Sequence, residues 1–285
     1  MLFTSSQCDA ILGKKQKIAP LATRAYVKYC VKWAVDYEKF VFLYFGKVLF
    51  NPKKQVKLHT TMIDIALFCV NPFQENTYVV TDKATGRCII IDAGCSNATE
   101  TAAIIDYIRS NRLEAEMIVG THGHIDHIMG VQTLKDELGI PFALSSDDRF
   151  LVESAAQQAA MFGLKVPVTP TIDIDLKERD EITFGETVLK VIPTPGHTPG
   201  HVCLYHEEGR MLFTGDTLFR ESIGRTDLPG GDYSWIMRSI LDRIVPLGDD
   251  VVFHPGHGPS SDVGHEVLYN PFVVEVMNNE INYRG

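Results

Sequence analysis

From residue 62 onward, the hydrophobic and polar positions of this chain alternate between strand-like and helix-like patterns. Residues 63–68, 76–81 and 87–92 are short runs rich in β-branched and aromatic residues, separated by Asn-Pro and Thr-Gly turn signals. Residues 98–110 place Ala, Ile and Tyr at helical spacing, and Asn97 is available to cap the first turn. The pattern predicts three strands followed by a helix.

The same alternation continues to the end of the chain. Further strands are expected at residues 117–120, 187–192, 201–206, 210–214 and 251–253, and further helices at residues 130–138, 147–160 and 232–244. Strands outnumber helices in each half, and each half begins with strands. This predicts an α+β fold in which two sheets pack together and helices cover the outside.

Residues 1–61 differ from the rest in charge. They contain 11 Lys and Arg against 3 Asp and Glu, whereas residues 62–285 contain 16 against 33. A basic arm touching a membrane surface, a targeting presequence, and a stretch outside the functional domain are three interpretations. Asp36 and Glu38 argue against a presequence, and the strand pattern begins at Met62. We therefore expect a basic extension of unknown role over 1–61 and the functional domain over 62–285.

Composition excludes several classes of protein. The net charge of −9 argues against general nucleic-acid binding. No apolar run approaches the roughly 20 residues of a membrane-spanning helix. The six cysteines include no C-x-x-C pair, which favours free thiols in a reducing compartment. We expect a cytoplasmic protein that acts on a small molecule; the sequence fixes no oligomeric state.

The strongest chemical signal is THGHIDHIMG, residues 121–130, directly after an apolar strand. His122, His124, Asp126 and His127 fall within six positions. Imidazole and carboxylate ligands together suit zinc, iron or manganese. A polar loop with one incidental histidine is common, but three histidines and an aspartate in one short loop favour a metal site.

Three further motifs follow strands in the same way. TPGHTPGH (194–201) holds His197 in a loop fixed by Pro and Gly, and HPGHGP (254–259) presents His257 similarly. FTGDTLF (213–219) offers Asp216 as a bridging carboxylate. His201 begins the next strand, so a supporting role is favoured over ligation. His254 ranks below His257 as a candidate ligand.

The order and spacing of these motifs over residues 62–285 resemble the metallo-β-lactamase superfamily, and most closely its glyoxalase II (hydroxyacylglutathione hydrolase) group. The resemblance implies a four-layer αβ/βα sandwich. It implies two divalent metal ions, zinc first, with iron or manganese as alternatives. The implied ligands are His122, His124 and His197 for the first ion, Asp126, His127 and His257 for the second, and Asp216 for both.

The resemblance also implies an activity. A metal-bound hydroxide would attack a thioester such as S-lactoylglutathione, with Asp126 as a candidate proton acceptor. Asp92, after the strand 87–92, would orient a ligand through a hydrogen bond, although a turn-capping role explains it equally well. Only 28 residues follow His257, with one basic residue, Arg284. The chain thus resembles short forms that lack the C-terminal glutathione-binding helical domain.

Two other functions fit parts of the pattern. Persulfide dioxygenases, which use a single iron, share the GRTD stretch found at residues 224–227, but His201 matches the thioesterase pattern. Arg225 in that stretch is either an anion contact for substrate or part of a structural salt bridge. A metal-binding protein without catalysis is the third possibility. β-Lactamase activity is not expected, since such enzymes usually carry Cys at the position of Asp216.

Overall fold

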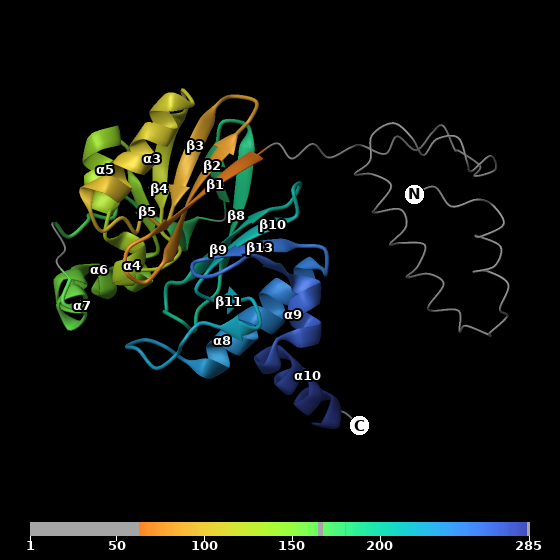
Figure 1. Cartoon of the computed structure of the whole chain (residues 1–285). Helices are drawn as coiled ribbons and strands as arrows, with labels where there is room; N and C mark the ends of the chain where they lie inside the picture. Colours follow the sequence, from red (N-terminus) through yellow and green to blue (C-terminus); the bar gives the residue numbers. More distant parts are fainter. Residues whose placement is uncertain (1–62, 165–167, 180, 284–285) are drawn as a thin grey trace, which may run out of the picture. The chain divides into compact units, whose positions relative to one another are not determined.

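Two six-stranded sheets form the centre of the described part of the chain. The computed structural model describes residues 63–164, 168–179 and 181–283, so the expectation for residues 1–61 lies outside the described residues. The first sheet has the order β1-β2-β3-β4-β5-β6 and the second β14-β13-β10-β9-β8-β7 (Figure 1). Each sheet is therefore built almost entirely from one half of the sequence.

The first sheet mixes antiparallel and parallel pairs. β1, β2 and β3 pair antiparallel, whereas β3, β4, β5 and β6 pair parallel. Its strands are β1 (Ile63–Val70), β2 (Glu75–Asp82), β3 (Arg87–Ile91), β4 (Glu114–Val119), β5 (Phe142–Leu144) and β6 (Ile174–Asp175). Because parallel neighbours end at the same edge, the loops after β3, β4 and β5 emerge side by side.

The second sheet is antiparallel except for one pair, β10 with β13. Its strands are β7 (Glu181–Phe184), β8 (Thr187–Pro193), β9 (Val202–His206), β10 (Met211–Gly215), β13 (Val252–Pro255) and β14 (Ser261–Asp262). A separate hairpin joins β11 (Leu218–Phe219) to β12 (Ser222–Ile223). The parallel pair brings the ends of β10 and β13 to one edge, where they carry two of the four motifs.

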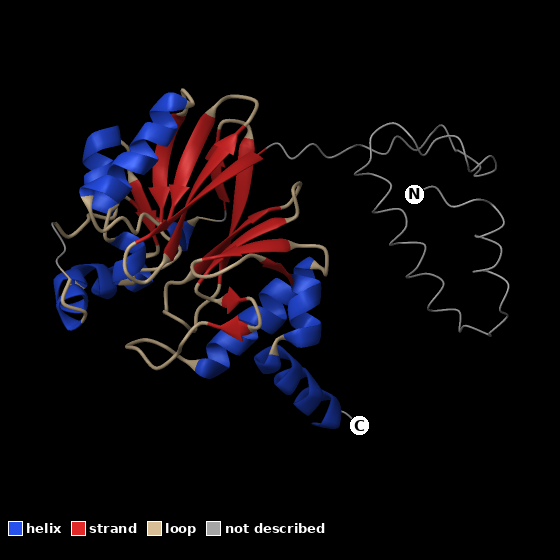
Figure 2. Ribbon diagram, viewed as in Figure 1, coloured by secondary structure: helices blue, strands red, loops and turns tan. Residues whose placement is uncertain are grey.

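Helices cover the outer face of each sheet (Figure 2). On the first sheet lie α3 (Ala98–Ser110), α4 (Ile125–Ile128), α5 (Val131–Leu138), α6 (Arg149–Glu153) and α7 (Ala155–Met161), with the short turns η1 (Ser146–Asp148) and η2 (Leu176–Glu178). On the second lie α8 (Tyr233–Ser239), η3 (Ile240–Ile244), η4 (Val245–Leu247), α9 (Val263–Tyr269) and α10 (Pro271–Tyr283).

Alternating side chains on the strands divide the interior into three apolar cores. In β3, Ile89 and Ile91 face the second sheet, while Cys88 and Ile90 pack under α3 and α5. In β9, Val202 and Leu204 face the first sheet, while Cys203 and Tyr205 pack under α8, α9 and α10. This two-residue period, repeated in both sheets, confirms the expected four-layer αβ/βα sandwich.

Several local expectations need correction. The helix expected over 147–160 is a 3-10 turn followed by two helices, because the backbone bends at Ser154. The helix expected over 232–244 ends as an α-helix at Ser239 and continues as a π-helical turn. Strands β5, β6, β7, β11, β12 and β14 and helices α4, α9 and α10 were not expected from the sequence.

Membrane-spanning helices and the state of the cysteines are two further features of the described residues. No helix there is both long enough and apolar enough to cross a membrane. Cys69, Cys88, Cys95 and Cys203 are free, and the last three are buried.

Candidate metal centre

The four sequence motifs meet at one edge of the two sheets. His122 and His124 lie in the loop between β4 and α4, and His127 lies on α4 itself. His197 comes from the β8–β9 loop, Asp216 follows β10, and His257 follows β13. The two halves are joined directly here, since the backbone N–H of Asn76 donates to Gly256 O at 2.8 Å. The centre therefore draws its side chains from both sheets.

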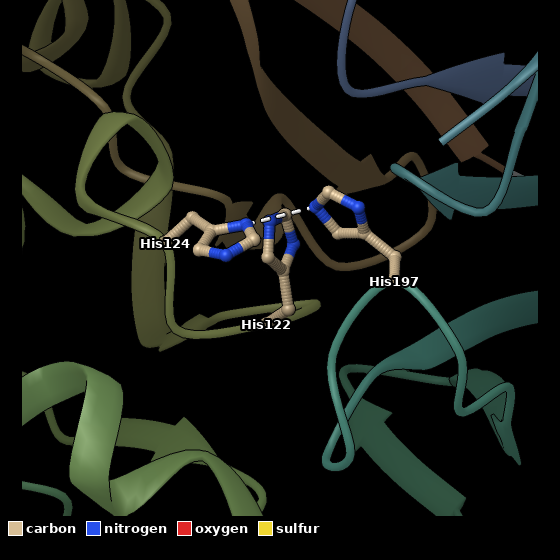
Figure 3. A group of neighbouring side chains, drawn as sticks. All are labelled: His122, His124 and His197. Carbon is tan, nitrogen blue, oxygen red and sulfur yellow. Dashed lines mark hydrogen bonds between the residues drawn. The ribbon is translucent and has the colours of Figure 1, made fainter. Parts of the chain in front are cut away.

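Three of the histidines form one compact group. His122, His124 and His197 each place a ring nitrogen within 4.8 Å of the others, and all three are buried. Nδ1 of His124 lies 2.8 Å from Nε2 of His197 (Figure 3). Figure 3 shows the three rings converging from two separate loops on one point. This group matches the expected ligands of a first ion.

A second group lies beside the first. Asp126, His127 and His257 also place their ligand atoms within 4.8 Å of one another. Nε2 of His257 lies 3.2 Å from Oδ2 of Asp126 and 3.3 Å from Nε2 of His127. This group matches the expected ligands of a second ion.

Asp216 lies between the two groups. Its Oδ1 is 3.4 Å from Nε2 of His127, and its Oδ2 is 3.6 Å from Nε2 of both His197 and His257. One carboxylate thus approaches ligands of both proposed ions. All seven residues expected to bind metal are brought together.

Hydrogen bonds to the outer ring nitrogens set the tautomers of three histidines. Nδ1 of His197 donates to Arg225 O at 2.7 Å, and Nδ1 of His257 donates to Phe73 O at 3.2 Å. Nδ1 of His127 lies 3.0 Å from Oδ2 of Asp92. With the proton on Nδ1, each neutral ring turns the lone pair of Nε2 towards the centre, as a metal ligand requires.

Asp92 reaches His122 as well, through Thr121. The carboxylate accepts from the Thr121 N–H at 2.7 Å and from its hydroxyl at 2.8 Å. The same Thr121 oxygen lies 3.0 Å from Nδ1 of His122 and can accept its proton. Asp92 therefore reaches one histidine of each group through hydrogen bonds, His127 directly and His122 through Thr121.

Burial and charge separate the two groups electrostatically. Burial lowers the pKa of His124 to about 3 and lowers the pKa of His122 well below its ordinary value. Burial acts on His127 in the same direction, but the carboxylates of Asp216, Asp126 and Asp92 outweigh it and raise the pKa of His127 well above its ordinary value. Without a metal, His122 and His124 are therefore uncharged, whereas His127 of the second group holds a proton among carboxylates.

The carboxylates of the centre are held ionised. Burial acts to raise the pKa of Asp216, but His127, His197 and His257 outweigh it and lower that pKa. The pKa of Asp126 is lowered in the same way, with His127 as the main opposing partner to burial. A group of buried anions and lone pairs at one point is suited to a cation.

Unpartnered atoms test whether a metal fits this set of residues. Nε2 of His122 and Oδ1 of Asp216 are buried and have no hydrogen-bond partner in the described structure. An unsatisfied buried polar group costs about 1–3 kcal/mol. A divalent cation between the rings would provide a partner for both atoms. The donor set of imidazoles and carboxylates, without thiolate, fits zinc, iron or manganese.

The remaining predicted residues lie around this centre. Nε2 of His201 accepts a hydrogen bond from the backbone N–H of Asp216 at 3.0 Å. Its ring stacks on the ring of His122, with 5.1 Å between the ring centroids. Arg225 contributes its carbonyl to His197, while its guanidinium makes two 2.7 Å hydrogen bonds to Asp227. His254 lies 2.9 Å from Ser260 Oγ. His201 and Arg225 thus support ligands, and His254 has a partner of its own.

Sequence reasoning missed two buried carboxylates. Glu75 lies near Asp92 and His127, and burial raises its pKa well above the ordinary value. Asp148 is fully buried and accepts three hydrogen bonds from the loops that carry His122, His124 and His197. Burial raises the pKa of Asp148, and these hydrogen bonds oppose the rise. For Asp148, the only signal in the sequence is the pair Asp147-Asp148, which resembles an ordinary helix cap.

A four-layer sandwich with a histidine and aspartate cluster at one edge defines a class of metal-dependent proteins. The chain belongs to the metallo-β-lactamase superfamily, whose family model matches residues 70–257. Members of this superfamily are generally metal-dependent hydrolases.

One curated relative and two solved structures are similar to this chain over most of their length. Hydroxyacylglutathione hydrolase GloC of Haemophilus influenzae is 35% identical over 218 residues, which are 74% of this chain and 98% of the relative. The crystal structure of the BLEG-1 B3 metallo-β-lactamase superposes with a TM-score of 0.68 at 33% identity, covering 74% of this chain and 99% of that one. TTHA1623 in a di-iron-bound form has a TM-score of 0.64 at 36% identity, covering 73% and 99%.

Proposed function

We propose that this protein is a dinuclear metal-dependent thioesterase that hydrolyses S-lactoylglutathione or a similar 2-hydroxyacyl thioester in the cytoplasm. The observation that carries the proposal is the pair of three-residue groups that share Asp216. The relative named GloC supports the substrate class at 35% identity over nearly its full length. No Ser or Cys nucleophile is required by this arrangement.

The seven clustered residues are assigned to two metal positions. His122, His124 and His197 would hold the first ion, Asp126, His127 and His257 would hold the second, and Asp216 would serve both. Two divalent ions at these positions supply positive charge that acidifies a water molecule and polarises a thioester carbonyl. Zinc is the proposed metal, with iron or manganese as alternatives, since the donor set accepts all three.

The surrounding residues keep the ligands in place. Asp92, Thr121 and His201 orient His127, His122 and Asp216 through the hydrogen bonds described above. The lowered pKa of Asp126 makes its carboxylate a weak base, so we assign it to metal binding first and to proton acceptance second. Arg225 is assigned to support of His197, because its guanidinium is already paired with Asp227.

Thiol release from S-lactoylglutathione tests the proposal. Zinc-loaded protein should release thiol in a chromogenic assay, and Asp216→Asn should lose at least about 100-fold in kcat/KM because both ions depend on that carboxylate. Asp106→Asn, at an exposed position on α3, is the matched control and should retain full activity. Equal activity in the wild-type protein and Asp216→Asn would refute the thioesterase.

Two other activities belong in the same experiment. Oxygen consumption with glutathione persulfide and one iron per chain would favour the dioxygenase suggested by the GRTD stretch. Hydrolysis of a β-lactam is the second, because BLEG-1 is a relative at 33% identity. A content of two zinc ions per chain and thioester hydrolysis without either activity supports the proposed function.

A further inference from the structure

Asp148 occupies a buried position between two ligand-bearing loops. It is the last residue of η1, directly after β5, and its side chain is fully buried. Oδ2 accepts from the Gly123 N–H at 2.9 Å and from the Thr198 hydroxyl at 2.7 Å. Oδ1 accepts from the Gly200 N–H at 2.7 Å. One carboxylate thus binds the loop of the first sheet and the loop of the second.

The three donors are immediate neighbours of the first group of histidines. Gly123 lies between His122 and His124, and Thr198 follows His197 directly. A backbone bond from Val202 N–H to Thr121 O, 2.9 Å, also joins the two segments, but at the strand ends. Asp148 therefore links the two loops directly beside the proposed ligands.

Close approach to Asp148 explains two glycines of the motifs. A Cβ on Gly123 would lie 3.2 Å from Cβ of Asp148, and a Cβ on Gly200 would lie 2.8 Å from its Oδ1. Side chains at these two positions would push the loops away from the carboxylate. The glycines of THGH and of the second TPGH are thus part of the same arrangement as Asp148.

The geometry points to Asp148 as a positioning residue that clamps the His122–His124 loop to the His197 loop and sets the spacing of the three histidines of the first metal site. The inference rests on the metal site of the proposed function. Displacing a ligand by a fraction of an ångström weakens a metal site, so a buried clamp next to the ligands has a direct effect on affinity.

Asp148→Asn tests the clamp with almost no change of volume. An amide has one acceptor oxygen and one donor nitrogen. Whichever way the amide turns, its NH2 group faces either the Gly200 N–H or the two donors of the other oxygen. The substitution therefore releases at least one contact that holds the two loops together.

The experiment measures each metal site separately. His257→Ala disables the second site and leaves the first to be titrated, while His124→Ala does the opposite. Zinc affinity is measured against a competing chelator, and the visible spectrum of the cobalt-substituted protein reports ligand geometry. In the His257→Ala background, Asp148→Asn should weaken zinc binding about tenfold or more and shift the cobalt spectrum. In the His124→Ala background the change should stay below about threefold.

Two further variants keep the test decisive. Asp147→Asn alters the neighbouring, exposed aspartate, which pairs with Lys177 at 2.7 Å, and should change neither affinity. Thr198→Val removes one donor of the clamp without touching Asp148 and should weaken the first site about three- to tenfold. It decides the question if Asp148→Asn fails to fold.

Particular outcomes would overturn the inference. Equal weakening in both backgrounds, or a lower melting temperature with unchanged zinc affinity and cobalt spectrum, would reduce Asp148 to a general structural residue. Failure of the proposed function is read separately, because thiol release from S-lactoylglutathione is measured in the wild-type protein. A metal-binding protein without thioesterase activity would retain the clamp and lose the proposed function.

Discussion

Replacing Asp92 by Asn exchanges a hydrogen-bond acceptor for a donor at the centre of the metal site. Asp92 has a φ of 52°, a left-handed conformation that Asn tolerates well, so the backbone is expected to remain in place. The amide oxygen can still accept from the Thr121 N–H, which places NH2 opposite Nδ1 of His127. That ring must then move its proton to Nε2, the nitrogen proposed to bind the second ion.

The magnitude follows from the contacts that are lost. The bond between His127 and Asp92 spans 3.0 Å and involves a charged group, which is worth about 1.5–3 kcal/mol. Since each 1.4 kcal/mol is a factor of ten, the second site should weaken about 10- to 100-fold. His122 receives the effect only through Thr121, a neutral bond of about 0.5–1.5 kcal/mol, so the first site should weaken about tenfold at most.

The assay is the stepwise titration with zinc against a competing chelator. The matched control is Asp82→Asn, a buried aspartate at the end of the neighbouring strand. It accepts from Ala84 N–H at 2.7 Å and Thr85 N–H at 3.1 Å, far along the chain from every proposed ligand. The control should lower the melting temperature and leave both zinc affinities unchanged. A larger loss at the first site than at the second would refute the reasoning about tautomers.

Three other predictions concern the whole domain. On acidification the second ion should leave first, because the carboxylates raise the pKa of His127 and His257 against the effect of burial, and protons compete with metal as the pH falls through those values. The pKa of His124 in the first group is about 3, so protons compete there only at lower pH. Metal content after dialysis along a pH series checks this, and loss of the first ion first would contradict it. Chelation should destabilise the fold by about 4 kcal/mol for an ion present at a thousand times its Kd, roughly 8–16 °C in Tm by scanning calorimetry; an unchanged Tm after complete metal removal would refute it. Phe253→Ala should lower the free energy of unfolding in urea by about 3–5 kcal/mol, since Phe253 is fully buried under α8 and α9. Val252→Ala, at the exposed neighbouring position, should lower it by less than about 1 kcal/mol, and similar losses at both positions would contradict the packing.

The layers of the fold could be predicted because strands with cores on both sides, such as β2 and β3, are continuous runs of apolar and β-branched residues bounded by turn signals. The strands expected at 76–81 and 87–92 occur as β2 and β3, and the helix expected at 98–110 occurs with those bounds. Strand β5 has three residues and β6 has two, too few for any period to show. These strands owe their pairing to neighbours in the sheet and not to their own composition.

The ligands could be predicted for a different reason. Each lies in a short motif directly after an apolar strand, where residue type alone signals the chemistry. Asp148 gives no such signal, since an aspartate before a helix is usually a cap. The partner of His197 is the carbonyl of Arg225, and a main-chain atom leaves no trace in residue type. The sequence thus identifies the residues proposed to bind metal more readily than the atoms that orient them.

The order of the ligands along the chain has a consequence for biosynthesis. His122, His124 and His127 are synthesised with the first sheet, whereas Asp216 and His257 arrive with β10 and β13, which pair in parallel near the end of the domain. A nascent chain that has reached only β10 contains all three histidines of the first group, but it lacks Asp216 and His257, and its second sheet is incomplete. Because His257 and the shared Asp216 come last, we expect the second ion to bind only after β13 has paired with β10.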